Sequence, residues 1–157
     1  MTIALRDPLA SLLPDASFFS ATEVVADNAI RVTFGSAMVL VGTQGTAIIA
    51  VAPMFRRLPT GNQAEFCAAL LGYNSEMGGV AAFAIQKDGW VVLHAARPLS
   101  GIDRNEFAML VTAVGRLADH YDDVLDQAYY GGKGRRAEGA SNAPGAEAPQ
   151  APTASEA

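Results

Sequence analysis

The feature that most constrains the fold is a long amphipathic helix near the C-terminal end of the sequence. Asp103 and Glu106 have the spacing of a capping box, which predicts where the helix begins. Ile102 and Phe107 occupy the two positions of a hydrophobic staple, and Gly131 predicts an end just before it. The apolar stripe consists of Phe107, Leu110, Val111, Val114, Leu117, Ala118, Tyr121 and Leu125. A stripe of this length has to pack against a second layer of secondary structure.

The segments before this helix supply that layer. Five of them are rich in Val, Ile and Ala and follow turn residues, as is typical of strands: residues 30–34, 37–41, 46–54, 81–86 and 90–96. The last two flank Lys87-Asp88-Gly89, and Asp-Gly is a strong hairpin signal because Gly tolerates positive φ at little cost.

Two shorter helices complete the prediction. Residues 7–13 begin with Asp7 as N-cap and Pro8 at the first helical position. Residues 62–73 begin with Asn62 in a capping-box spacing, while residues 15–28 are ambiguous. The order is therefore α-β-β-β-α-β-β-α, which predicts a two-layer α+β fold with an antiparallel sheet.

The chain of 157 residues suits one domain, and 50% hydrophobic residues suffice for a core. After Gly132 the sequence contains no large apolar residue and no periodicity. Such a segment cannot bury enough apolar surface to offset its ordering entropy. We therefore expect a folded domain over residues 1–132 and a disordered Ala/Pro/Gly-rich tail over residues 133–157.

Charge and cysteine content favour a cytoplasmic protein. The net charge of −5, from 11 Lys and Arg against 16 Asp and Glu, argues against nucleic acid and anionic membranes as partners. Cys67 is the one cysteine, so an intrachain disulfide and a Cys-clustered zinc site are excluded. The first residues lack the pattern of a secretory signal, and the apolar stretch 37–54 is interrupted by Gly42–Gly45.

Candidate catalytic groups have structural interpretations that are favoured over functional ones. Asp122-Asp123-Val124-Leu125-Asp126 matches a DDxxD metal motif, but no second acidic cluster accompanies it, so these residues and Asp119 are expected on the solvated side of the helix. His94 is expected as a partly exposed strand residue, and neither it nor His120 lies in a nucleophile or zinc motif. Cys67 is expected to be packed. No catalytic residue, metal or cofactor is predicted.

A short basic cluster begins the predicted tail. Lys133, Arg135 and Arg136 lie within residues 131–136 and could contact an acidic partner or nucleic acid. Without interleaved aromatic residues, a solubilising linker is the favoured interpretation.

The hairpin predicts apolar residues on both faces of the sheet. A two-residue loop at Asp88-Gly89 would place Phe83, Ile85, Trp90 and Val92 on one face and Val91, Leu93 and Ala95 on the other. A change of one residue in the loop would exchange these assignments. Helices of the same chain could cover both faces; otherwise the second face needs a twin subunit or a bound segment of another protein. The first four residues are the candidate protein-binding site.

The sequence resembles the YbjN-like family in a succession of motifs that ends with the last helix. These motifs are Leu70-Leu71-Gly72-Tyr73-Asn74, residues 81–85, Asp88-Gly89-Trp90-Val91-Val92-Leu93 and Arg97-Pro98-Leu99-Ser100-Gly101-Ile102-Asp103. That family is similar to the type III secretion chaperones, including the CesT-like group. The resemblance covers residues 58–132. It implies a small acidic protein, usually a homodimer, that binds peptide segments without catalytic residues or a cofactor. Within it, Asn74 is expected to end a helix.

The sequence thus predicts a non-enzymatic, chaperone-like protein that binds a client along an apolar sheet face or edge. A regulatory or scaffolding module that acts through its own dimerisation, as the sensory-transduction label of YbjN-like proteins implies, is the alternative. A small enzyme that uses His94 or the Asp cluster is a third, less favoured hypothesis.

Overall fold

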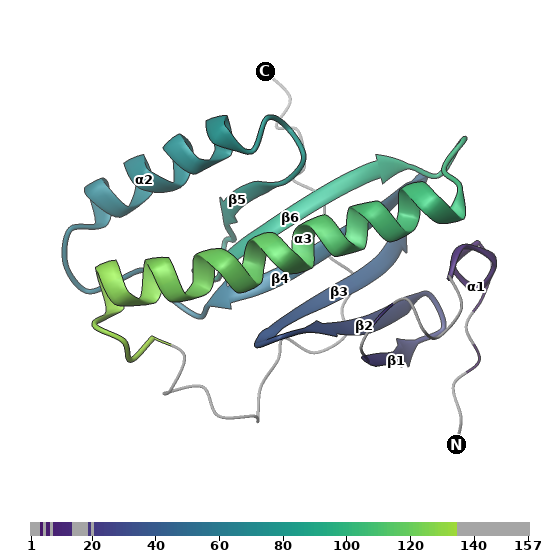
Figure 1. Ribbon diagram of the computed structural model, residues 1–157, viewed down its shortest axis with the longest axis horizontal. Helices are drawn as coiled ribbons and strands as arrows, with labels where there is room; N and C mark the ends of the chain where they lie inside the picture. Colours follow the sequence, from purple (N-terminus) through teal and green to yellow (C-terminus); the bar gives the residue numbers. More distant parts are fainter. Residues whose placement is uncertain (1–3, 5, 7, 14–18, 20, 135–157) are drawn as a thin grey trace.

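The structure is a computed structural model that describes residues 4, 6, 8–13, 19 and 21–134 (Figure 1). Its elements are α1 (Leu9–Leu12), β1 (Ala21–Ala26), β2 (Ala29–Phe34), β3 (Ala37–Gln44), β4 (Ala47–Phe55), α2 (Gln63–Glu76), β5 (Ala82–Ile85), β6 (Val91–Pro98), α3 (Arg104–Leu125) and the π-helix η1 (Asp126–Tyr130). The expected N-cap Asp7 and all of the predicted tail except Lys133 and Gly134 lie outside the described residues.

The strands form one six-stranded antiparallel sheet in the order β1-β2-β3-β4-β6-β5. This confirms the predicted two-layer α+β class, with one strand more than expected. The additional strand, β1, lies in the segment 15–28 that the sequence left ambiguous. The first half of β1 is exposed, so this strand lacks an alternating apolar pattern. Its backbone pairing with β2 keeps it in the sheet.

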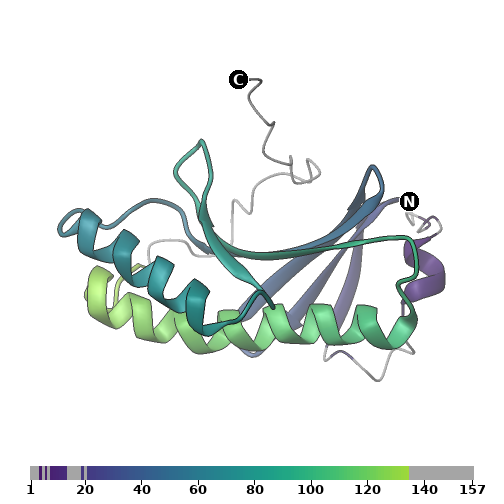
Figure 2. The same ribbon diagram turned by 90° about the horizontal axis from the view of Figure 1, so that it is seen from above.

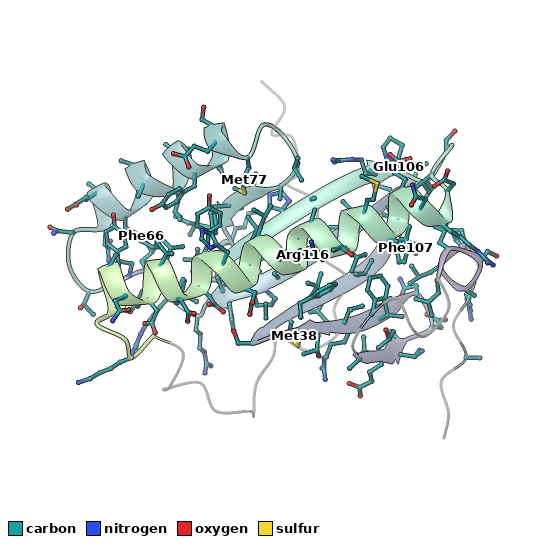
Figure 3. All side chains as sticks on the ribbon, viewed as in Figure 1. Met38, Phe66, Met77, Glu106, Phe107 and Arg116 are labelled. Atoms are coloured by element: carbon teal, nitrogen blue, oxygen red, sulfur yellow. The ribbon has the colours of Figure 1, made fainter. Side chains whose placement is uncertain are left out.

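The described helices all lie against the same face of the sheet (Figure 2). The stripe of α3 packs on strands β2, β3, β4 and β6, as predicted. Phe107 is fully buried at one end of this layer, and Phe66 points from α2 toward the other end of α3 (Figure 3). The core between the layers contains Ile30, Val32, Val39, Val41, Ile48, Ala50, Leu93, Val111, Val114 and Leu125.

The helix ends agree with the sequence for α3 and differ for α2. The Asp103 carboxylate accepts a hydrogen bond from the Glu106 backbone N–H at 2.8 Å, and the helical segment ends at Gly131, which has a φ of 66°. Asn62 has a φ of 50° and makes no side-chain cap, so its predicted capping role is wrong. The Gln63 amide donates instead to the Pro59 carbonyl at 2.9 Å.

Asn74 lies within α2 and does not end it, which corrects the expectation drawn from the family resemblance. Its side-chain oxygen accepts from the Phe83 N–H at 2.6 Å, and its amide nitrogen donates to the Phe83 carbonyl at 3.2 Å. One side chain thus satisfies both backbone groups of a residue in β5, the last strand of the sheet.

The acidic residues of α3 also differ from expectation, because two of them face the sheet. Asp122 is fully buried, and its Oδ2 accepts from the Ser36 hydroxyl at 3.1 Å. Asp119 Oδ1 accepts from the backbone N–H of Ser36 at 2.9 Å and also lies 2.9 Å from the Ser36 hydroxyl, whose single proton is shared between the two carboxylates. The β2–β3 turn therefore docks on α3 through polar contacts, while Asp123 remains exposed as predicted.

Candidate functional site

The register of the β5–β6 hairpin decides which residues share a face. Ile85 pairs with Val91 and Phe83 with Leu93, and the Gln86 N–H donates to the Trp90 carbonyl at 2.8 Å. The loop therefore has three residues, Lys87 to Gly89, and not the two that were predicted. Gly89 alone among them has a positive φ, 90°, whereas a two-residue type I′ turn needs positive φ at both central positions.

This slip of one residue separates the four candidate binding residues, so the prediction that they share a face is wrong. Phe83 and Ile85 lie on the helix side, where Phe83 is buried against the rings of Tyr73 and Tyr121. Val92 lies on the opposite side, and strand alternation, continued through the hydrogen bond between Gln86 and Trp90, places Trp90 there as well. Trp90 is half-buried and Ile85 is exposed at the end of its strand.

The side of the sheet away from the helices is here called the open face. Strand pairing places Leu40 beside Val51, Val51 beside His94, and Pro53 beside Val92. The apolar members of the open face are Met38, Leu40, Ala47, Ile49, Val51, Pro53, Ala82, Ala84, Trp90, Val92 and Ala96. The expectation that both faces of the sheet are apolar therefore agrees with the strand pairing, with different residues on each.

The open face has an apolar centre and a polar margin. Val51 and Val92 are only 8% and 4% exposed, while Met38, Leu40, Ile49 and Trp90 around them are half-buried. At the margin on β1 and β2, Arg31 and Glu23 form an ion pair at 3.0 Å. No described helix covers this face, so the alternative in which helices of the chain cover both faces does not hold for the described residues.

His94 is the titratable group within the apolar centre. Its neighbours across the strands are Val51 on β4 and Ala82 on β5, neither of which can accept a proton or neutralise a charge. Burial lowers the pKa of His94 below its usual 6.5. The centre of the open face is therefore uncharged at neutral pH.

We expect a His94→Leu variant to lose part of the wild-type acid sensitivity. Above pH 6.5 the imidazole is neutral in the folded and the unfolded chain, so its contribution to stability is complete there. As the pH falls below that value the unfolded chain binds the proton first, and the free energy of unfolding falls until the lowered folded pKa is passed. Urea unfolding at about pH 7.5 and about pH 5 measures this change, with His120→Gln, at an exposed histidine, as control. Equal acid sensitivity in wild type and the His94→Leu variant would refute it.

A second uncovered apolar surface lies on α2. Leu71 is 69% exposed, the largest value among the exposed large apolar side chains of the described residues. Ala64, Ala68 and Ser75 are exposed near it, at spacings that place them on the same side of the helix. We call these four residues the outer face of α2.

The candidate catalytic groups are not brought together. Within the described residues no group of three or more His, Cys, Asp or Glu side chains could hold a metal ion. Cys67 is half-buried in α2, and His94 and His120 lie on different elements. Across the same residues, no helix combines the length and apolarity needed to cross a membrane.

Sequence reasoning missed the contributions of β3 and β4 to the open face. Met38 and Leu40 alternate with Ala37, Val39 and Val41, and all five are apolar, so the pattern could not say which set faces the helices. The sequence does contain a signal for an apolar open face, because large apolar residues occupy both alternating sets of positions in this strand.

Comparison with protein families identifies a matching family. The model of the Tir chaperone protein (CesT) family matches residues 11–121, which is more than half of the chain. No curated protein sequence matches the chain.

Solved structures with a similar fold include chains of three complexes. For the crystal structure of the ExsC–ExsE complex the TM-score is 0.58 at 14% identity, covering 78% of this chain and 97% of the other. For the HopA1–SchA chaperone–effector complex it is 0.56 at 10% identity, covering 73% and 93%. For the heterodimeric ExoU–SpcU complex from the type III secretion system of Pseudomonas aeruginosa it is 0.54 at 15% identity, covering 68% and 89%. These likenesses confirm the fold.

Proposed function

Because the chain belongs to the Tir chaperone protein (CesT) family, we propose that it is a non-enzymatic chaperone-like protein that binds peptide segments of a client protein. We also infer, from the motif succession between Leu70 and Asp103, a relationship to the YbjN-like family, which is similar to these chaperones. The folded domain is proposed to end near Gly132, with the remaining residues as a tail.

The observation that carries the proposal is the open face. It presents the half-buried side chains of Leu40, Ile49 and Trp90 around the buried pair Val51 and Val92, on a side of the sheet that no described helix covers. Burying apolar surface of this kind is favourable, by roughly 25 cal/mol per Å². An extended client segment with alternating apolar side chains would match the two-residue period of the strands beneath it.

Trp90 and Val92 therefore keep their proposed binding role, together with Leu40, Ile49 and Val51. The buried ring of Phe83 supports the hairpin from the helix side, and Ile85 is placed at the margin of the site.

We further propose a homodimer in which the outer face of α2 packs against a second copy of the chain. Leu71 would be its central apolar contact, and the small side chains of Ala64 and Ala68 would let two helices approach closely. This proposal also accommodates the alternative function as a dimerisation module, because it leaves the open face accessible on each copy.

The open face is tested by a Leu40→Glu, Trp90→Glu double variant. Each introduced carboxylate would lose its hydration beneath the apolar side chains of a client, although the one at position 40 has Arg31 as its cross-strand neighbour, so the amount of client that co-purifies from the native host should fall by about tenfold or more. Val124→Glu, at a 40% exposed position on α3, should change nothing. Quantitative mass spectrometry measures the captured protein, and hydrogen exchange measures where it protects the chain. Protection confined to α3, or equal capture by all three proteins, would refute the open face as the binding site.

A further inference from the structure

A cleft of about 690 Å³ lies at the end of the molecule where β4 leads toward α2. The residues that line it include Phe55, Arg56, Arg57, Tyr129, Tyr130 and Lys133. They come from two segments more than 60 residues apart in the sequence: the end of β4 with the loop after it, and the end of η1 with the residues that follow. Lys133, the member of the short basic cluster that the structure describes, is thereby brought to the same cleft as Arg56 and Arg57, which lie outside that cluster in the sequence.

The cleft is cationic in a chain whose formal charge is −5. Arg56, Arg57 and Lys133 are exposed, and no Asp or Glu is among the described residues that line the cleft. The nearby Asp126 carboxylate accepts from the Gly134 N–H at 2.7 Å, which holds the C-terminal wall in place. Like charges gathered in a concave site of this kind attract an anionic group.

A rare local conformation builds the aromatic part of the cleft. The π-helix η1 widens the last turn so that Tyr130 stacks on Phe55, with ring centroids 4.3 Å apart and an interplanar angle of 12°. The Tyr130 hydroxyl donates to the Arg57 carbonyl at 2.7 Å and so fixes the segment that carries both arginines. Single π-turns of this type occur frequently at functional sites.

Tyr129 adds a neutral hydroxyl to the same wall. Burial, with the nearby Glu65 and Tyr73, raises the pKa of Tyr129, so the phenol stays protonated at neutral pH. Its ring packs edge-on against Phe66 at 5.1 Å. The wall therefore combines guanidinium and ammonium groups with the Tyr129 hydroxyl, and these donors suit carboxylate groups.

We propose that this cleft binds an acidic peptide segment of the client, through carboxylates held by Arg57 and Lys133. The inference deepens the proposed function, on which it rests for the identity of the partner. Charge complementarity selects the occupant. Because the chain as a whole carries a net negative charge, the negatively charged side chains of a client would be attracted to this basic cleft more than to the rest of its surface. The cleft would add selectivity for a client whose apolar segment is accompanied by Asp or Glu.

The test uses the full-length chain and a fluorescein-labelled oligoglutamate peptide, with fluorescence anisotropy as the readout. Wild type should bind the probe and lose affinity as salt rises from about 50 to about 300 mM. An Arg57→Gln, Lys133→Gln double variant should bind at least about tenfold more weakly, because two charge-assisted contacts are lost.

A Lys87→Gln, Arg116→Gln double variant is the matched control. It changes the net charge by the same amount at two exposed positions that do not line the cleft, one in the hairpin loop and one on the solvent side of α3 (Figure 3). Its affinity should equal that of wild type. Equal losses in both double variants, no binding by wild type, or equally tight binding of a labelled oligothymidylate would each overturn the proposal.

The open-face variant Leu40→Glu, Trp90→Glu separates this inference from the proposed function. The oligoglutamate probe has no apolar side chain, so that variant should bind it as wild type does. If the open-face variant loses the client while the cleft variant retains both client and probe, the cleft proposal fails and the proposed function stands. If the cleft variant loses the probe while the open-face variant retains the client, the open face fails as the client-binding site and the cleft remains an anion site. If wild type captures no client at all, the proposed function itself fails.

Discussion

A Leu71→Asp variant is expected to sediment as a monomer at concentrations where the wild-type chain is a dimer. Leu71 is 69% exposed on α2, at the centre of the proposed contact between two copies. An aspartate there would be desolvated without a partner in each copy, which costs several kcal/mol. The dissociation constant should therefore rise by about a hundredfold or more, as measured by analytical ultracentrifugation across a concentration series.

Met109→Asp provides the matched control for this result. Met109 is an apolar side chain of similar exposure, 63%, on α3 and outside the proposed contact. Its replacement should leave the dimer unchanged. A monomeric wild type at every concentration, or a dimer that survives Leu71→Asp, would show that the outer face of α2 is not the interface.

The second large effect is expected at Gly115, in the middle of α3. An added Cβ would overlap the ring of Phe34, which crosses the helix from β2 at this point. Overpacking of a tightly packed layer costs about 1–3 kcal/mol, and the ring cannot withdraw freely because Phe19 packs against it edge-on at 5.8 Å. We expect Gly115→Ala to lower the free energy of unfolding by about 2–3 kcal/mol, although alanine is the better helix former.

Two variants isolate the clash from helix propensity. Gly72→Ala, in α2, has no atom within 4 Å of the added Cβ and should stabilise the chain by about 0.5–1 kcal/mol. Phe34→Leu should remove much of the penalty of Gly115→Ala, giving a non-additive double-mutant cycle. Additive effects in urea unfolding would contradict direct contact between these two positions.

The long helix could be predicted because local signals and packing agree there. The Asp103 cap, the apolar stripe and the glycines after Tyr130 all report on neighbouring residues in the sequence. The antiparallel sheet could be predicted for the same reason, because its strands are apolar segments separated by turn residues. Strand β1 could not be predicted, because its pairing with β2, and not its own composition, makes it a strand.

The candidate site was harder to predict because a sheet has a period of two. Asp-Gly suits both a two-residue and a three-residue loop, and the choice moves Phe83 and Ile85 to the opposite face from Trp90. The contacts of Asp119 and Asp122 with Ser36 were equally inaccessible, because they join residues more than 80 positions apart. The cleft was not predicted for the same reason, because Arg57 and Lys133 are also far apart in the sequence.

The hydrogen bonds of Asn74 to Phe83 restrict how another chain can associate with the sheet. Strand β5 is the terminal strand on its side, and Phe83 is the residue whose outward N–H and C=O groups are both occupied by the Asn74 amide. An incoming strand could not form its ladder there without displacing that side chain. Lengthening of the sheet by a partner is thus blocked at this border, and self-association into continuous β-ribbons would have to start from β1 at the far side.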